Sequence, residues 1–176
     1  MRLAHNPGMS PENIGNVLGA LAEWVTDQVE DAVASEELNR AEASALSHLS
    51  KYPDRSIESV RGPLGLSHSG CVRLIDRLAQ GGYVERREGE DARKVALHLT
   101  RRGREFVEAA AERRAEALAR ALHVLDPKER ESLGGLLSKL LARSIPRAST
   151  ALKVCLLCDY SACVECPLGE LTAPER

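Results

Sequence analysis

The sequence of 176 residues is poor in aromatic side chains and has no long apolar run. One Trp, three Tyr and one Phe leave little material for an aromatic-lined ligand pocket. No stretch approaches the roughly 18 consecutive apolar residues of a membrane helix, and the N-terminus lacks the apolar centre of a signal peptide. Because 43% of the residues are nevertheless hydrophobic, we expect a folded, cytoplasmic protein with no membrane partner.

The common catalytic motifs are also missing. The sequence contains no glycine-rich phosphate loop, no His-Glu-x-x-His zinc motif and no nucleophile elbow. Most of its acidic residues fall on the surfaces of expected helices. We therefore expect that the protein is not an enzyme.

Charge is distributed unevenly along the chain, although the net charge is only −2. Residues 51–104 contain twelve Lys or Arg against seven Asp or Glu, so this centre carries +5 and the two flanks together carry −7. A basic segment between acidic flanks is typical of a nucleic-acid-binding module joined to parts with another role. Charge alone leaves open the alternative of a solvated surface with uneven charge.

Apolar residues recur at helical spacing through most of the chain, which predicts a mainly α-helical fold. Ser10-Pro11 and Asp126-Pro127 each place a capping residue before a proline, a frequent start of a helix. Gly62 to Leu66, with two glycines and a proline, is expected to form a turn. The predicted helices are residues 11–34, 39–51, 56–61, 67–79, 101–124 and 126–145.

The helix predicted at residues 67–79 has the properties of a DNA-reading helix. Ser67 is a good N-cap, and an apolar stripe of Cys71, Leu74, Ile75 and Leu78 must face the core. The opposite face starts with small polar residues and carries two arginines, which pair well with guanine edges or phosphates in a major groove. This exposed face consists of His68, Ser69, Val72, Arg73, Asp76 and Arg77.

The hydrophobic period changes after Gly81-Gly82. Residues 83–87 and 94–100 are two strand-like runs, and the charged segment between them contains turn residues. They predict a β-hairpin at residues 83–99. A helix-turn-helix followed by such a hairpin is a winged helix, whose wing tip reaches a backbone or a minor groove. The fold class is therefore mainly α with a small β-hairpin wing.

From Leu66 to Gly103 the chain reads LSHSGCVRLIDRLAQGGYVERREGEDARKVALHLTRRG. This stretch resembles the MarR family of bacterial transcriptional regulators, because GGYVERRE, the Asp-x-Arg element and LHLTRRG occur together in the family's order. The resemblance implies a homodimer that binds double-stranded DNA. It also implies that Asp91 stabilises the wing, that Arg93 enters the minor groove, and that segment 67–77 reads the major groove.

The helices outside the winged helix have more apolar faces than one small domain can cover, which favours pairing across a two-fold axis. We predict an N-terminal dimerisation helix (11–38), a winged helix (39–103), C-terminal dimerisation helices (104–146) and a cofactor-binding tail (147–176). The predicted DNA-binding residues are Ser67, His68, Ser69, Arg73, Arg77, Arg86, Arg87, Arg93 and Lys94.

Four of the five cysteines, Cys155, Cys158, Cys163 and Cys166, lie within twelve residues near the C-terminus. Thiols clustered in a reducing compartment bind a metal, hold an iron-sulfur cluster or exchange electrons. The last three cysteines have the spacing of plant-type ferredoxins, and Pro167 follows the last one as in bacterial ferredoxins. We expect an iron-sulfur cluster, 2Fe-2S or 4Fe-4S. Zinc bound by all four cysteines, or metal-free thiols that switch by disulfide formation, remain alternatives.

These features together predict a homodimeric repressor that reads a palindromic operator and senses redox state or stress through its cysteines. One alternative is a constitutive or ligand-responsive regulator with a purely structural zinc tail. A small-molecule effector near the dimer interface is a further option. An electron-transfer protein is the more distant alternative, since it leaves the wing and the DNA-reading helix without a role.

Overall fold

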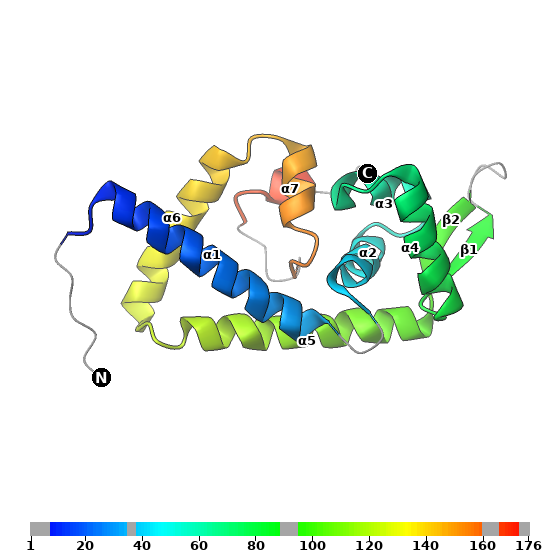
Figure 1. The fold of residues 1–176 in the computed structure, drawn as a ribbon, viewed down its shortest axis with the longest axis horizontal. Helices are drawn as coiled ribbons and strands as arrows, with labels where there is room; N and C mark the ends of the chain where they lie inside the picture. Colours follow the sequence, from blue (N-terminus) through cyan, green and yellow to red (C-terminus); the bar gives the residue numbers. More distant parts are fainter. Residues whose placement is uncertain (1–7, 35–37, 89–94, 160–165, 173–176) are drawn as a thin grey trace.

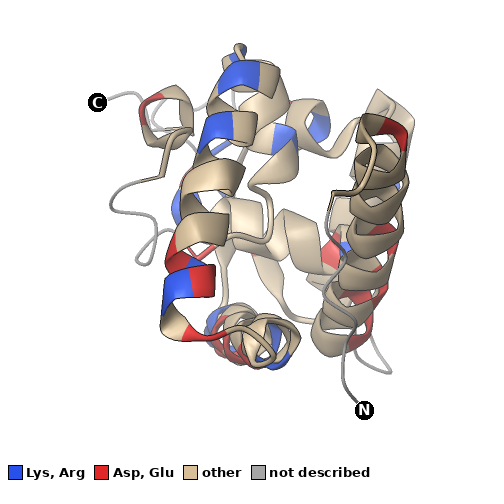
Figure 2. Cartoon of the chain, turned by 90° about the vertical axis from the view of Figure 1, so that its left-hand side faces the viewer, with Lys and Arg blue, Asp and Glu red and all other residues tan. Residues whose placement is uncertain are grey.

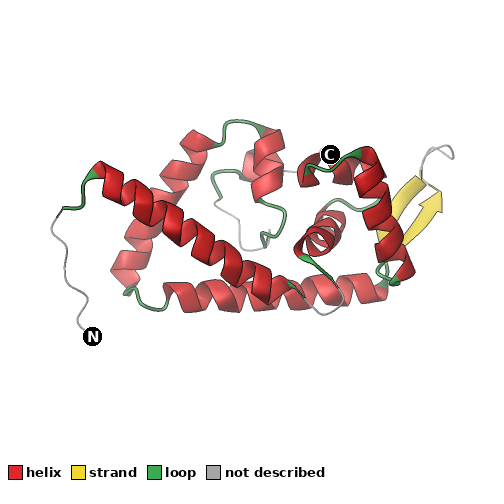
Figure 3. Cartoon of the chain, in the orientation of Figure 1, coloured by secondary structure: helices red, strands yellow, loops and turns green. Residues whose placement is uncertain are grey.

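The structure is a computed structural model that describes residues 8–34, 38–88, 95–159 and 166–172. It confirms a mainly helical fold with one two-stranded hairpin (Figure 3). The first elements are α1 (Pro11–Val33), α2 (Arg40–Lys51), α3 (Ile57–Leu64), α4 (His68–Gln80), β1 (Val84–Glu88) and β2 (Val95–Leu99). They are followed by α5 (Arg101–Leu122), α6 (Pro127–Ser144), α7 (Ala148–Val154) and α8 (Gly169–Thr172). No helix within the described ranges is long and apolar enough to cross a membrane.

Each long helix begins after a side chain that accepts a hydrogen bond from its first turn. Ser10 caps α1, Ser67 caps α4 and Thr100 caps α5 in this way. Asn39 and Asp126 form complete capping boxes at the starts of α2 and α6. These caps satisfy N–H groups that have no partner inside the helix, so the sequence locates the helix starts closely.

The hairpin is antiparallel, with Val84 opposite Leu99 and Glu88 opposite Val95. The Leu97 side chain is fully buried, and its N–H donates to the carbonyl of Arg55 at 3.0 Å. This bond joins the sheet to the segment after α2. The hairpin lies at the end of the molecule opposite the start of α1 (Figure 1).

The main core lies between α2, α3, α4 and the hairpin. Its fully buried side chains include Leu46, Val60, Ile75, Leu78 and Leu97, and side chains of α5 pack against the edge of the cluster. Burying an aliphatic side chain of this size stabilises a fold by about 1.5–3 kcal/mol. The winged helix therefore has a core of its own.

The C-terminal half of α1 packs along α5. Val29 and Val33 of α1 meet Ala43 of α2 and Ala110 of α5 in a second apolar cluster. The described residues of α6 include none that is buried. The C-terminal half of α1 and part of α5 thus pack against the winged helix, whereas the described residues of α6 contribute no buried side chain.

The helix α3 extends further than the sequence predicts. The turn expected from Gly62 onwards is wrong for its first residues, because α3 continues through Pro63 to Leu64 and ends at Gly65 with a φ of +67°. Pro63 removes one helical hydrogen bond. Ile57 and Leu64, however, both pack against the main core, and this burial outweighs the lost bond.

The tail that starts at residue 147 contains two short helices that the sequence did not predict. α7 packs against α3, and α8 packs against α7. The buried centre of this part consists of Ala151, Cys155 and Leu168. Figure 1 shows the tail between α6 and the α2–α3 pair. The tail is therefore a folded element in contact with the winged helix.

Candidate nucleic-acid interface

The helix α4 exposes the polar face that the sequence predicts. Its cap is tight, because the Ser67 hydroxyl accepts from the N–H of Gly70 at 3.1 Å. Arg73 is exposed and makes no hydrogen bond or ion pair with the described residues. Ser67, His68, Ser69, Arg73 and Arg77 are all exposed, whereas Cys71, Leu74, Ile75 and Leu78 are at most 3% exposed.

Arg77 connects α4 to α2. Its Nε donates to Oε1 of Glu42 at 2.8 Å, and the Glu42 side chain is only 7% exposed. The second oxygen, Oε2, accepts from the N–H of Asn39 at 3.1 Å and completes the capping box. Both oxygens of a buried carboxylate are thus satisfied. The Arg77 side chain is still 56% exposed, so it can also meet a phosphate.

Two arginines of the wing strand β1 have carboxylate partners as well. Arg86 donates to Asp76 of α4 at 2.6 Å, and both side chains are about 40% exposed. Arg87 pairs with Glu85 on the same strand. Exposed ion pairs contribute only about 0–1 kcal/mol, so a DNA phosphate can compete for these arginines. The Arg86–Asp76 pair also joins the wing to α4.

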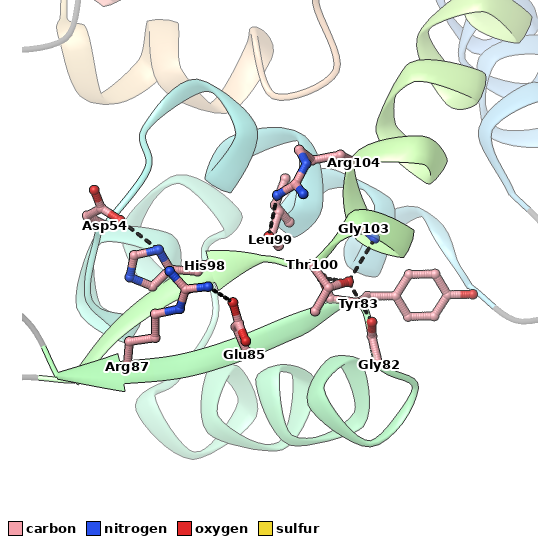
Figure 4. Close-up of polar contacts among 10 residues, drawn as sticks. All are labelled: Asp54, Gly82, Tyr83, Glu85, Arg87, His98, Leu99, Thr100, Gly103 and Arg104. Carbon is pink, nitrogen blue, oxygen red and sulfur yellow. Dashed lines mark hydrogen bonds and ion pairs between the residues drawn. The ribbon is translucent and has the colours of Figure 1, made fainter.

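The base of the wing is held by a compact set of backbone contacts (Figure 4). The Thr100 hydroxyl donates to the carbonyl of Gly82 at 2.6 Å and accepts from the N–H of Gly103 at 3.1 Å. A Cβ added at Gly103 would lie 2.2 Å from the carbonyl oxygen of Tyr83, so no other residue fits there without a shift. The turn before β1 is therefore fixed against the first turn of α5.

Several basic residues of the central segment serve the fold. Arg102 lies over the Tyr83 ring at 4.4 Å and donates to the carbonyl of Gly81 at 2.8 Å. Arg104 donates to the carbonyl of Leu99 at 2.8 Å, at the base of the wing (Figure 4). The positive charge counted from the sequence thus overstates the number of side chains available to DNA.

The wing tip, residues 89–94, lies outside the described residues. The predicted contacts Arg93 and Lys94 and the predicted wing-stabilising Asp91 fall in this segment. Their roles stay predictions.

Three of the four clustered cysteines lie in one apolar cluster of the tail. Cys155 is 7% exposed, and Cys158 and Cys166 are partly buried and pack against the same cluster. Cys163 lies outside the described residues. The described residues hold no group of three His, Cys, Asp or Glu arranged to bind a metal ion. The four-cysteine site is therefore still a prediction.

Two of these sulfur atoms have donors beside them. Nη2 of Arg114, on α5, lies 4.0 Å from Sγ of Cys158. The N–H of Leu168 points at Sγ of Cys166 at 3.5 Å. A nearby cation and a backbone N–H donor both stabilise a negatively charged thiolate, and such groups are common beside metal-bound sulfur atoms.

Cys71 is a different kind of thiol. It is fully buried on the inner face of α4, and its Sγ lies 3.6 Å from the carbonyl oxygen of Ile57. Burial raises the pKa of the Cys71 thiol, with the nearby Glu58 carboxylate adding to the effect. Cys71 is therefore a core residue, as its place on the apolar stripe predicts.

A cavity of about 220 Å³ lies where the tail meets α2 and α5. Its apolar wall includes Val33 and Ala110, and its polar wall includes Lys51, Arg114 and Cys158. The cavity adjoins the cysteine segment and is not an aromatic-lined pocket.

Large apolar side chains of α1 and α6 are exposed at the end of the molecule away from the hairpin. Figure 2 looks at this end of the molecule and shows long uncharged stretches on both helices. Residues 13–22 of α1 and 132–138 of α6 contain no charged side chain. The large apolar side chains exposed here by 38–60% are Ile14, Val17, Leu18, Leu21, Trp24, Leu136, Leu137, Leu140 and Leu141.

Sequence reasoning missed the residues that act by contact with distant parts of the chain. Glu42 has a visible signal, because its place three residues after Asn39 fits a capping box. Gly103 has a weaker one as a glycine in the first turn of a helix. Lys51 and Tyr52 have none, since their partners lie more than 100 residues away.

Comparison with known proteins agrees with this geometry. Residues 37–94 match the sequence profile of the MarR family, a range that includes every predicted DNA-binding residue. YfiV of Bacillus subtilis, an uncharacterized HTH-type transcriptional regulator, is 26% identical over 132 residues, which are 74% of this chain and 76% of YfiV. The transcriptional repressor MprA of Escherichia coli is 33% identical over 81 residues. This match covers 46% of each protein, so the chain spans about half the length of MprA.

Among solved structures, a MarR family protein from Bacillus stearothermophilus superimposes with a TM-score of 0.68 at 21% identity. The superposition covers 78% of this chain and 99% of that protein. The likeness shows a shared fold. It also leaves more than a fifth of this chain without a counterpart in that structure.

Proposed function

We propose that this protein is a DNA-binding regulator of the MarR type, a homodimeric repressor controlled through its C-terminal cysteines. Its winged helix supports this proposal, because residues 37–94 match the MarR family profile. It acts in the cytoplasm on a palindromic duplex. The repressor role is favoured by the relative MprA, which is a transcriptional repressor.

The observation that carries DNA binding is the exposed face of α4 beside the hairpin. A helix capped by Ser67, with Arg73 exposed on the face opposite its buried stripe, suits a major groove. Arg86 and Arg87 on β1 lie next to it and suit phosphates. The wing tip with Arg93 is assigned to the minor groove.

Homodimer formation is favoured by the exposed apolar faces of α1 and α6. A monomer that exposed this many large apolar side chains in uncharged stretches would associate in water. A second copy offers the same two faces, and a two-fold axis places two α4 helices on one palindrome.

An electrophoretic or anisotropy titration with duplexes selected from a random pool tests DNA binding. We expect affinity to fall steeply with salt, since each phosphate contact releases counterions. Arg73→Ala or Arg93→Ala should each weaken binding by about 1–3 kcal/mol. Arg120→Ala is the matched control, because Arg120 is an exposed arginine of α5 away from α4. Equal affinities for all four proteins would contradict the proposed interface.

For the cysteines we propose an iron-sulfur cluster held by Cys155, Cys158, Cys163 and Cys166. The three described thiols share one apolar cluster, and donors lie beside two of the sulfur atoms. When bound, such a cluster adds a redox-sensitive group to the tail. Arg114 and the Leu168 N–H would then compensate the charge of the cysteine sulfurs.

Anaerobic purification followed by an absorption spectrum and iron, sulfide and zinc analysis tests this assignment. A brown protein with equal iron and sulfide, lost on replacing any one of the four cysteines by serine, supports the cluster. One zinc per chain in a colourless protein would show instead a structural zinc tail. Cys71→Ser is the control, because its thiol lies in the core of the winged helix.

A further inference from the structure

The cysteine tail is held by two consecutive residues at the end of α2. Nζ of Lys51 donates to the carbonyl oxygens of Cys155 and Leu156 at 3.0 and 3.2 Å. The Tyr52 hydroxyl donates to the carbonyl of Thr172 at 2.5 Å, in a buried position. The tail is thus held at two places, after α7 and at the end of α8, by the C-terminal end of α2.

The acceptors of Lys51 are the carbonyls that follow the last turn of α7. Such carbonyls have no partner inside the helix, and the negative end of the helix dipole favours a cation there. The Cys155 carbonyl also accepts from the N–H of Cys158 at 3.0 Å. The carbonyl oxygen of Cys155 therefore binds both Lys51 and the N–H that closes the turn between Cys155 and Cys158.

The same short segment contacts the dimerisation part of the molecule. Leu157 packs on the cluster of α1, α2 and α5 that contains Val33 and Ala110. Arg114 of α5 approaches the sulfur of Cys158. Within four residues the chain therefore contacts both α2 and α5, and α2 is joined to α4 by the ion pair between Glu42 and Arg77.

We infer that Lys51 and Tyr52 form a clasp that converts the state of the cysteines into the position of the DNA-reading helix. Ligation of Cys155 and Cys158 fixes the turn whose carbonyls Lys51 binds, whereas loss of the ligated metal releases that turn and with it the end of α2. The change reaches α4 through the buried Glu42 of α2, which binds Arg77. This inference rests on the proposed function, because it assumes that the cysteines hold a metal and that α4 binds DNA.

The test uses the full-length double variant Lys51→Met, Tyr52→Phe, which keeps the apolar parts of both side chains and removes their donors. The control is Lys153→Met, an exposed lysine of α7. Each protein is measured as purified anaerobically and after removal of its metal with a chelator and reductant. The readouts are metal content, affinity for a selected duplex, and hydrogen exchange of residues 148–158.

We expect wild type and Lys153→Met to change DNA affinity by about tenfold between the two states, within the usual range of coupling between sites. The double variant should hold the same metal content and bind DNA, but its affinity should change less than about twofold. Its α7 amides should exchange faster than those of the wild type even with the metal bound.

Two results overturn the clasp. One is a double variant that keeps the wild-type affinity ratio, and the other is unchanged exchange in α7. A wild type that contains no metal or binds no duplex would instead show that the proposed function has failed. That result is read from the wild-type protein alone, so the two failures are distinct.

Discussion

The winged helix and the α1–α6 end of the molecule differ in how well a single chain buries their apolar side chains. In the winged helix, Leu46, Ile75 and Leu97 are fully buried. In α6, the described residues include none that is buried, and Leu136 and Leu140 are 60% and 50% exposed. The winged helix thus has its own core, whereas the helical end leaves large apolar side chains exposed, as our proposal of a homodimer expects. The two halves should respond differently to mutation.

The largest expected effect is at the base of the wing. Gly103→Ala should destabilise the winged helix by about 3–5 kcal/mol, because a Cβ would lie 2.2 Å from the Tyr83 carbonyl oxygen and both backbones must shift. Urea denaturation monitored by circular dichroism measures this loss. Such a loss would show that the stability of the winged helix depends on the close approach of Gly103 to the Tyr83 carbonyl.

The matched control is Gly19→Ala in α1. Gly19 has no atom within 4 Å of its added Cβ and lies on the side of the helix opposite Leu18 and Leu21, away from the apolar stripe. This change should be neutral or stabilise by up to about 1 kcal/mol, since alanine favours a helix over glycine. Equal losses for both glycines would contradict a specific role for Gly103.

A charge placed on α6 should break the other half. Leu137→Glu with Leu140→Glu should raise the dimer dissociation constant at least about a hundredfold, because two carboxylates would have to be buried in an apolar interface. The unfolding midpoint of the winged helix should change little. Analytical ultracentrifugation measures the association, and Lys139→Glu on the opposite side of α6 is the control. A double variant that dimerises like wild type would rule out this face.

Acid pH should weaken the winged helix through His48. Burial lowers the pKa of His48 to about 4, with Lys51 and Arg55 adding to the shift, and the ring packs against Tyr52. Its Nε2 has no hydrogen-bond partner among the described residues. Between pH 6.5 and about 4 the unfolded chain therefore binds a proton that the folded chain does not.

Stability should consequently fall as the pH drops through this window, by at most on the order of 3 kcal/mol, and should be unaffected by His48 above pH 7. The free energy of unfolding measured in urea at pH 4, 5, 6 and 7 checks the slope. His48→Gln should unfold more easily at pH 7 but lose less stability on acidification. The same slope in both proteins would exclude His48 as the cause.

The sequence predicts the winged helix better than the surroundings of its functional residues. Helix starts are local, since Ser67 or Asn39 binds an N–H within the next turn, and the buried stripe of α4 follows from periodicity alone. Lys51 and Tyr52 contact the tail across more than 100 residues, and nothing in their own neighbourhood marks them. Local patterns give helices, whereas partners across the fold require the structure.

The turn expected from Gly62 was wrong for the same reason. Gly-Pro is a good local signal for a turn. The burial of Ile57 and Leu64 against the main core, however, depends on the whole fold. The predicted DNA-binding set shows a related limit. Charge and exposure selected Arg77 correctly as a surface arginine, but its bond to a buried carboxylate is invisible in the sequence.

The smallest expected effect separates two arginines of one helix. Arg77→Ala should destabilise the winged helix by about 1–2 kcal/mol, because Glu42 would lose its charged partner while only 7% exposed. Arg73→Ala should change the free energy of unfolding by less than about 0.5 kcal/mol, since Arg73 makes no hydrogen bond or ion pair with the described residues. Its main effect should be a loss of affinity for the duplex. Urea midpoints and duplex titrations on the same two proteins measure both quantities. If Arg77→Ala left stability unchanged, Glu42 would have another route to a partner or to water, and the path from the clasp to α4 would need a different connection.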